Sequence, residues 1–270
     1  MLSFRRHDGG GGIDYELAKA VAASLKVKLK VIWYESENDE ESNPVDEINA
    51  FLSFGLCHMS ASFPLYLDAI AQGPGRSVRL ARYRHMPQSD VGKIIDLSQL
   101  IVSRPYRSTR FVVVLPGAST LKVSRLADLE GRTILAEEGT LAGAIAMQYQ
   151  GGRLRAKVDL VPPGPRTLWM LEAGKHDAAI IELDKFDAHL KQNRVSKLKL
   201  SGYEHGIRFN IALVSIAKHK DLIAFANTVI AAGLKDGSIA AMARRSGMTY
   251  RPPDGKRVRG PLSFSELARD

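Results

Sequence analysis

Residues 166–192, RTLWMLEAGKHDAAIIELDKFDAHLKQ, contain the pattern that decides the fold class. Apolar residues at helical spacing predict a helix over Arg166–Ala173, and Gly174 stands where helices commonly end in a left-handed residue. The apolar run within Ala178–Glu182 predicts a short buried strand, and Lys185–Gln192 predicts the next helix. A helix, a glycine, a buried strand and another helix in direct succession are typical of α/β proteins.

The same alternation extends outward to both ends of the chain. Further strands are expected at 27–34, 57–63, 110–115, 133–136, 158–161 and 209–216. Further helices are expected at 13–25, 44–54, 141–150, 219–233 and 237–246, with a helical turn at 124–129. Residues 72–94 and the tail beyond Pro253 show no periodicity, which predicts loops. We therefore predict an α/β fold with largely parallel sheets.

Length and composition exclude several classes of protein. The 270 residues, of which 45% are hydrophobic and 25% charged, fit a globular protein with one large or two ordinary domains. The single cysteine, Cys57, excludes an internal disulfide and a CxxC metal site. No P-loop, GxSxG or HExxH motif occurs, and the histidines lack metal-ligand spacing. We expect no catalytic residues, no metal site and no cofactor.

The net charge of +9 invites a nucleic-acid interpretation, but the position of the charges argues against it. Residues 35–47 carry acidic side chains and no basic ones, and the basic excess lies in 76–93 and 244–259. Neither basic segment has the interleaved aromatic residues of a single-strand binder. We expect no nucleic-acid partner.

The sequence contains no stretch that predicts a membrane span. The longest uncharged apolar stretch, Leu222–Leu234, has 13 residues and is too short to cross a bilayer. No signal-peptide pattern follows Met1, so the chain as given is expected to stay in the cytoplasm.

Seven short motifs occur in a fixed order along most of the chain. They are 12–21 (GIDYELAKAV), 103–106 (SRPY), 126–132 (LADLEGR), 138–140 (EGT), 172–182 (EAGKHDAAIIE), 206–218 and 234–239 (LKDGSI). Their order and spacing resemble those of bacterial extracellular solute-binding proteins of family 3, the periplasmic receptors of amino-acid ABC transporters. No single motif is specific by itself.

The resemblance implies a two-lobed, type II periplasmic-binding-protein fold with the ligand cleft between the lobes. Lobe 1 would comprise 1–109 and 206–250, lobe 2 would comprise 110–205, and 251–270 would form a tail. Closure on a ligand would be a hinge motion. The implied function is non-catalytic capture of a small polar solute for an ABC permease, by a periplasmic monomer that does not span the membrane.

The resemblance also implies a ligand site. Gly139, Thr140 and Leu141 match the turn that holds the ligand's carboxylate at a helix start, although Thr140 is also a good N-cap for that helix. Glu182 matches the family's ammonium-binding acid, although it could instead pair with a neighbouring lysine. The other positions expected to line the cleft are Phe4, Ser62, Tyr106 and Glu137.

One departure from the family concerns the ligand's carboxylate. The arginine that clamps it in the family should fall within 63–70, and that segment contains none. Arg76, Arg79 or Arg82 could substitute. Because Glu137 and Glu182 are both acidic, we expect a cationic or polyol-like ligand.

A second departure concerns the N-terminus. The family begins with a central strand of the first lobe, and no strand pattern precedes Ser3 and Phe4. A missing central strand would expose two sheet edges. Either the protein starts upstream, with a signal peptide, or it is a divergent member, such as those encoded beside quinoprotein dehydrogenases.

Two alternative functions stay open on the same fold. One is an accessory protein of a periplasmic dehydrogenase system that has lost amino-acid binding. The other is a dehydratase-type enzyme that uses Glu182 or Glu137 as its acid or base.

Overall fold

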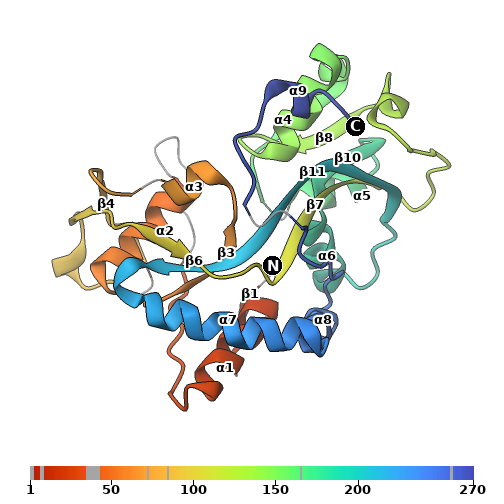
Figure 1. Cartoon of the computed structure of the whole chain (residues 1–270). Helices are drawn as coiled ribbons and strands as arrows, with labels where there is room; N and C mark the ends of the chain where they lie inside the picture. Colours follow the sequence, from red (N-terminus) through yellow and green to blue (C-terminus); the bar gives the residue numbers. More distant parts are fainter. Residues whose placement is uncertain are drawn as a thin grey trace.

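The computed structural model describes residues 3–6, 9–34, 43–71, 73–83, 85–164, 166–255 and 258–270. Two lobes are joined by a central pair of long strands, β7 (Arg107–Leu115) and β11 (Lys199–Ile216) (Figure 1). β11 pairs antiparallel with β7 as far as Ile211. From there it pairs antiparallel with β3 (Ser60–Pro64) and β6 (Leu100–Val102). One sheet therefore runs through both lobes.

The upper lobe in Figure 1 extends this sheet beyond β7. Its strands are β10 (Ala178–Glu182), β8 (Ile134–Glu137) and β9 (Val158–Val161). β10 runs antiparallel to β7 and parallel to β8, which is parallel to β9. Its helices are α4 (Leu141–Gln148), α5 (Arg166–Glu172) and α6 (Leu183–Gln192), with 3-10 turns η2 (Leu126–Leu129), η3 (Tyr149–Gly151) and η4 (Arg155–Lys157).

Alternate residues of β7 divide the core of the upper lobe into two layers. Phe111 and Val113 pack with residues of α4, and Val112 and Val114 pack with residues of α5 and α6. Successive side chains of a strand point to opposite faces, and every residue of β7 is buried. The unbroken apolar run within 110–115 is what a strand covered on both faces requires.

The lower lobe divides its core across β11 in the same way. Ile211 and Leu213 pack with α1, α7 and α8, while Ala212 and Val214 pack with α2 and α3. The helices are α1 (Ile13–Ser24), α2 (Pro44–Phe54), α3 (Leu67–Ala71), α7 (Lys220–Lys235) and α8 (Ser238–Arg245), with 3-10 turns η1 (Gln88–Asp90) and η5 (Ala217–His219). Two hairpins complete it, β1 (Ser3–Arg6) with β2 (Gly9–Gly12) and β4 (Ser77–Arg79) with β5 (Ile94–Asp96).

Local sequence signals place several helix ends correctly. The side chain of Asn43 accepts a hydrogen bond from the Val45 amide at 3.0 Å, and Pro44 opens α2 as its position predicts. Gly174 follows α5 with a φ of +74°, the left-handed conformation predicted for it. The strand predicted at Ala178–Glu182 has the same bounds as β10.

Three predictions about local structure are wrong. Residues 27–34 form no strand although their side chains alternate, because a strand needs a hydrogen-bonded neighbour and no described segment pairs with them. Residues 72–94 are not all loop, since β4 lies among them and pairs with β5. The sheet is mixed rather than largely parallel, because the long strands β7 and β11 that connect the lobes run antiparallel.

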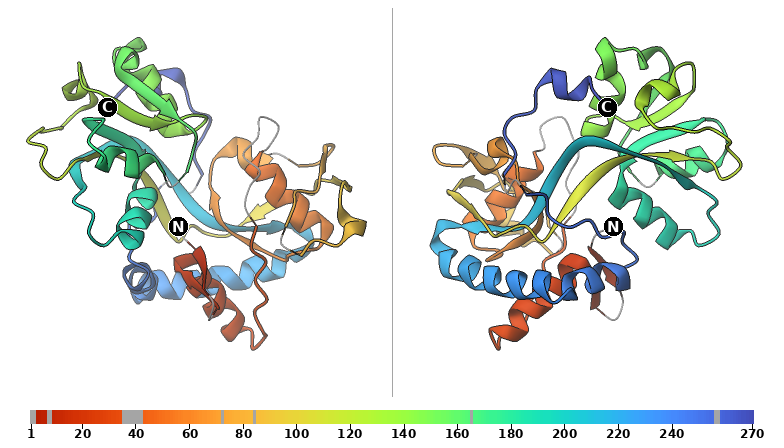
Figure 2. Two further views of the ribbon diagram at one scale, coloured as in Figure 1. Left: turned by 180° about the vertical axis from the view of Figure 1, so that it is seen from behind. Right: turned by 45° about the vertical axis from the view of Figure 1, so that its right-hand side comes forward.

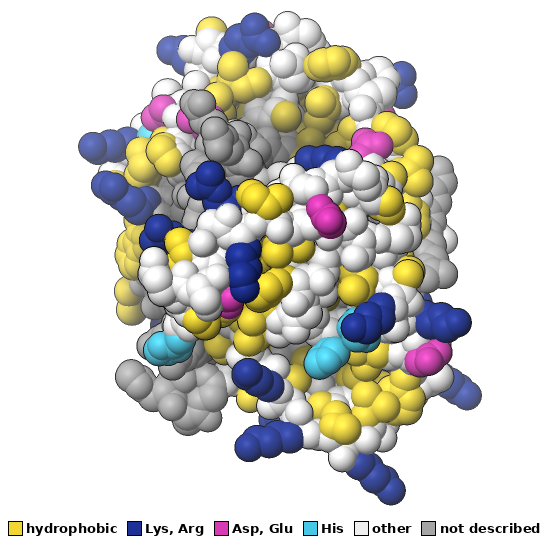
Figure 3. Space-filling model, turned by 90° about the vertical axis from the view of Figure 1, so that its left-hand side faces the viewer, with side chains coloured by type: hydrophobic (Ala, Val, Ile, Leu, Met, Phe, Trp, Pro, Cys, Tyr) yellow, Lys and Arg dark blue, Asp and Glu magenta, His cyan; other side chains and the backbone are white. Residues whose placement is uncertain are grey.

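Basic side chains of the positive segments form ion pairs. Arg76 donates two hydrogen bonds to the Asp46 carboxylate, at 3.0 and 2.7 Å, and Arg251 pairs with Glu204. On the face seen in Figure 3 the Lys and Arg side chains are spread among uncharged surface rather than gathered in one patch. Such dispersion suits a solvated surface.

No single described helix is long and apolar enough to cross a membrane, and only α8 together with the longer helix before it, bent by 83°, reaches that length and hydropathy.

The tail beyond Pro253 has more structure than its sequence pattern predicts. It passes the start of α3, crosses to the upper lobe and forms the short helix α9 (Phe264–Leu267) beside α4 (Figures 1 and 2). Ser263 caps α9, and Leu262 and Leu267 pack against the core of the upper lobe.

Candidate ligand-binding site

Two adjoining cavities lie between the lobes and share Ser62, Glu182 and Asp184 in their linings. The first, of about 800 Å³, is called the large cavity and is lined by 29–34 and β3 on one side and by α5 and α6 on the other. The second, of about 560 Å³, is called the crossover cavity because β7 and β11 form its back. Clefts between lobes are a common location for small-molecule sites.

Glu182 stands at the contact of the two cavities, where β10 ends and α6 begins without an intervening loop. Burial raises the pKa of Glu182, and Asp184 and Glu137 add to this while Lys185 opposes it. A carboxyl at the carboxyl end of a strand, facing a cleft, is suited to receive a cationic group of a ligand.

Glu137 lines the large cavity but is committed to protein contacts. Its carboxylate pairs with Lys185 and accepts hydrogen bonds from the Thr167 hydroxyl at 2.8 Å and the Gly164 amide at 3.3 Å. Only 2% of the residue is exposed. Its negative charge is therefore compensated, which removes one of the two reasons for expecting a cationic ligand.

Arg107 is the arginine of this site, and sequence reasoning missed it. It begins β7, is 2% exposed and donates from Nη1 to Asp184 at 2.8 Å. Its Nε and Nη2 have no hydrogen-bond partner among the described residues. Burial alone would lower the pKa of Arg107, but the charge of Asp184 raises it, with smaller contributions from Tyr106 and Asp14. The crossover cavity thus contains a fixed cation with unused donors.

Two further residues in the lining of the crossover cavity carry hydrogen-bond donors. The buried hydroxyl of Thr109 has no partner among the described residues. Leu141 opens α4, whose first turn leaves backbone N–H groups without intrahelical acceptors. Together with Arg107 these groups supply donors suited to an anionic ligand group.

The turn before α4 supports the site without lining either cavity. The hydroxyl of Thr140 accepts from the Gly143 amide at 3.1 Å and donates to the Glu137 carbonyl at 2.8 Å. Gly139 has a φ of +65°. At Gly143 an added Cβ would lie 2.2 Å from the Glu137 carbonyl oxygen, so only glycine fits there. The structure therefore supports the N-cap role of Thr140.

Ser62 is held by a hydrogen-bond network that includes Asp14, which also lines the large cavity. The hydroxyls of Tyr106 and Ser62 donate to the Asp14 carboxylate at 2.5 and 2.6 Å, and the Ser62 amide donates to the Tyr106 oxygen at 3.2 Å. Ser62 has a φ of +59°, an unfavourable conformation for a residue other than glycine. Tyr106 itself is fully buried and lines neither cavity, so its role is to hold Ser62 in this conformation.

The structure brings together part of the expected site. Ser62, Glu137, Leu141 and Glu182 line the cavities, and the side chain of Phe4 lies outside the described residues. The proposed substitute arginines line neither cavity. The one signal for Arg107 was its place directly after the 103–106 motif.

No family model and no curated protein sequence matches the chain. Solved structures do match it. A mutant of ArgBP from T. maritima superposes with a TM-score of 0.57 at 19% identity, over 91% of this chain and 89% of that one. A substrate-binding protein of an amino acid ABC transporter gives 0.57 at 18%, over 91% and 93%. A histidine kinase sensor domain with similarity to periplasmic binding proteins gives 0.62 at 14%, over 93% and 92%.

The chain has the two-lobed fold of the periplasmic binding proteins. This agrees with the family that the sequence motifs resemble. At such identities the likeness establishes the fold, so the function has to be argued from the cavities.

Glu182→Gln is expected to stabilise the protein at neutral pH. The folded-state pKa of Glu182 is raised, so the unfolded chain loses this proton first, and the folded state loses stability as pH rises above about 4.3. Glutamine has no proton to lose. Urea unfolding should show the variant to be more stable than the wild type at pH 7 and no more stable at pH 4. Glu138→Gln, at an exposed position directly after β8, is the control, and an equal gain there would contradict the interpretation.

Proposed function

We propose that the chain binds a small zwitterionic solute, an amino acid with an apolar side chain, between its two lobes. The observation that carries the proposal is the meeting of Arg107 and Thr109, which have unused donors, with the carboxyls of Glu182 and Asp184 in one cavity. Lobe 1 is proposed as 1–109 with 206–250, and lobe 2 as 110–205.

The carboxylate of the solute would bind in the crossover cavity. Nε and Nη2 of Arg107 are adjacent donors of one guanidinium, and this pair matches the two oxygens of a carboxylate. An incoming carboxylate would satisfy buried donors that are costly to leave unpaired. It would also offset the burial of the Arg107 charge.

The ammonium group of the solute would bind to Glu182. The Asp184 carboxylate is already engaged by Arg107, and that of Glu137 by Lys185. Glu182 is thus the carboxyl that both cavities share and that no described cation holds by an ion pair.

The side chain of the solute would extend into the large cavity. Val31, Trp33, Phe51 and Met59 are part of its lining. Apolar and aromatic walls favour an apolar side chain. We therefore propose a neutral amino acid in place of the cationic or polyol-like ligand that the sequence suggested.

We propose a receptor role, with delivery of the solute to an ABC permease outside the cytoplasm, and the fold shared with a transporter binding protein supports it. A catalytic role has less support. Acid–base chemistry needs a carboxyl free to exchange a proton, and of the two acids considered for this role Glu137 is engaged by its contacts, which leaves Glu182.

Thermal denaturation in the presence of single solutes tests the proposal. At 100 times its Kd, L-phenylalanine or L-leucine should stabilise the fold by about 2.7 kcal/mol, which raises the Tm by about 5–10 °C. Spermidine, which lacks a carboxylate, and glucose, which lacks both charges, should leave the Tm unchanged. A larger shift with spermidine than with any amino acid would refute the proposal.

A matched pair of threonine variants tests whether the ligand that shifts the Tm binds in the crossover cavity. Thr109→Val keeps the side-chain volume and removes the unpaired hydroxyl, so it should weaken amino-acid binding about fivefold. Thr228→Val removes a hydroxyl that donates to the Phe225 carbonyl within α7 and should leave the binding unaltered.

A further inference from the structure

Residues 258–270, called the strap, are hydrogen-bonded to both lobes. At the lower lobe the Arg259 amide donates to the Leu65 carbonyl at 2.9 Å, and the Leu67 amide donates to the Arg259 carbonyl at 2.8 Å. Arg259 also forms a parallel β-bridge with Tyr66. These bonds attach the strap where β3 meets α3.

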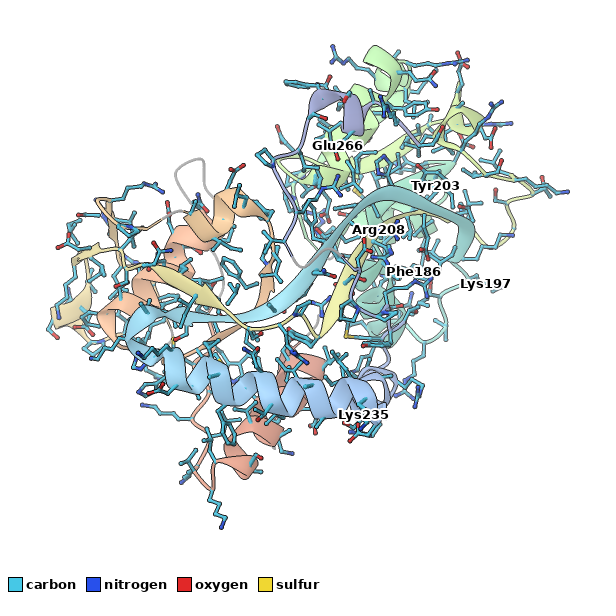
Figure 4. All side chains as sticks on the ribbon, viewed as in Figure 1. Phe186, Lys197, Tyr203, Arg208, Lys235 and Glu266 are labelled. Atoms are coloured by element: carbon cyan, nitrogen blue, oxygen red, sulfur yellow. The ribbon has the colours of Figure 1, made fainter. Side chains whose placement is uncertain are left out.

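The other end of the strap is attached to the upper lobe. The Asp270 carboxylate accepts from the Leu126 amide at 2.5 Å and from the Tyr149 hydroxyl at 2.9 Å. The Gln150 amide donates to the Ala268 carbonyl at 3.2 Å. In Figure 4, Glu266 of α9 lies at the upper lobe, far from Lys235 at the end of α7.

His205 forms a further hydrogen bond to the strap, and its other hydrogen bond shows which ring nitrogen carries the proton. Its Nδ1 accepts from the Ile207 amide at 2.9 Å, so its Nε2 carries the proton and donates to the Arg269 carbonyl at 2.9 Å. Burial lowers the pKa of His205. The imidazole is thus neutral when the strap is bound.

The middle of the strap is a wall of the crossover cavity. Gly260 and Leu262 line it together with Arg107 and Glu182. The guanidinium of Arg259 lies over the Phe209 ring, 5.8 Å from its centroid, and pairs with Glu266 of α9. The strap therefore bridges the lobes at the cavity itself.

We propose that the strap restricts how far the two lobes separate and closes one side of the ligand site. If the lobes separate, the bonds at Leu67 and at Asp270 cannot both persist, because they hold one short segment to different lobes. Opening then requires release of one end. A ligand that favours the closed form would bind more tightly while the strap is attached, and the coupling acts in both directions. This second consequence rests on the proposed function.

The test breaks the contacts of the strap at the upper lobe and measures whether its hydrogen bonds at the lower lobe become weaker. Asp270→Ala removes the acceptor of Leu126 and Tyr149 at the upper lobe. Amide exchange of Leu67 and Arg259, at the lower lobe, should accelerate about tenfold or more, and small-angle scattering should show a larger radius of gyration. Tyr149→Phe, which removes one of the two donors to Asp270 and also the acceptor of the Gln150 side chain, should give a smaller change in the same direction.

Phe264→Ala is the matched control, because this α9 side chain is 78% exposed. It should change neither measurement. If Asp270→Ala leaves the exchange of Leu67 and Arg259 and the scattering at their wild-type values, the strap does not couple the lobes and the proposal is wrong.

Neither readout needs a ligand, so the two proposals can fail separately. If release of the strap opens the protein but no amino acid binds, the role of the strap is supported and the proposed function is refuted. If the protein binds L-phenylalanine, Asp270→Ala should lower the affinity for it about tenfold. An unchanged affinity together with a larger radius of gyration would refute the coupling between the strap and the ligand site.

Discussion

Arg107→Met is expected to cost about 3–5 kcal/mol of folding stability. Arg107 is 2% exposed, and Asp184, its only ion-pair partner among the described residues, is 9% exposed. Removal of one member of a buried pair leaves the other charge without compensation. Urea unfolding at neutral pH measures the loss. The same variant should abolish amino-acid binding, because the proposed carboxylate partner is gone.

Two further variants test whether the loss of stability comes from leaving the buried Asp184 charge without a partner. Arg208→Met removes an ion pair to Asp254 at 3.2 Å in which both side chains are well exposed, so it should cost less than about 1 kcal/mol. The double variant Arg107→Met with Asp184→Leu should recover most of the lost stability, since it leaves no unpaired charge. Equal losses for Arg107→Met and Arg208→Met would contradict the assignment of a buried pair.

Asp14→Ala is expected to cost about 2–4 kcal/mol. The change removes the acceptor of two hydroxyls, those of Tyr106, which is fully buried, and Ser62. A buried donor left without an acceptor costs about 1–3 kcal/mol. Because the network also holds Ser62 at positive φ, amino-acid affinity should fall as well. Chemical denaturation and the thermal-shift titration measure the two effects.

A second carboxylate of α1 provides the comparison. Glu16 lies in the same first turn as Asp14 but forms only a loose pair with Lys19 at 3.8 Å. Glu16→Ala should cost less than about 1 kcal/mol and leave binding unchanged. If Asp14→Ala is as mild as Glu16→Ala, the buried network does not hold the site.

Local patterns predicted most of the elements. The strand at Ala178–Glu182 and the helix at 44–54 have the predicted bounds, because an apolar run, a proline at the first helical turn and a left-handed glycine are signals contained within a few residues. The order and spacing of short motifs predicted the two-lobed fold through their resemblance to those of a known family. Glu182 and Ser62 were placed at the site for the same reason.

Contacts between distant residues were not predictable in this way. Residues 27–34 alternate like a strand, yet strand formation depends on a partner that the described chain does not supply. The tail has no periodicity, yet α9 packs on α4 because Leu262 and Leu267 find apolar contacts there. Both outcomes depend on what lies beside a segment in space.

Some features of the ligand site were likewise predictable from the sequence and others were not. By itself the sequence determined the α/β class and the placement of Glu182 at a strand end, because these depend on local periodicity, while the two lobes were implied by the resemblance of its motifs to those of a known family. Only the tertiary structure decided that Arg107 is the buried cation, that Lys185 neutralises Glu137 and that the tail bridges the lobes. Charges interact through space, so the compensation of a carboxylate depends on which side chains the fold brings within a few ångströms of it.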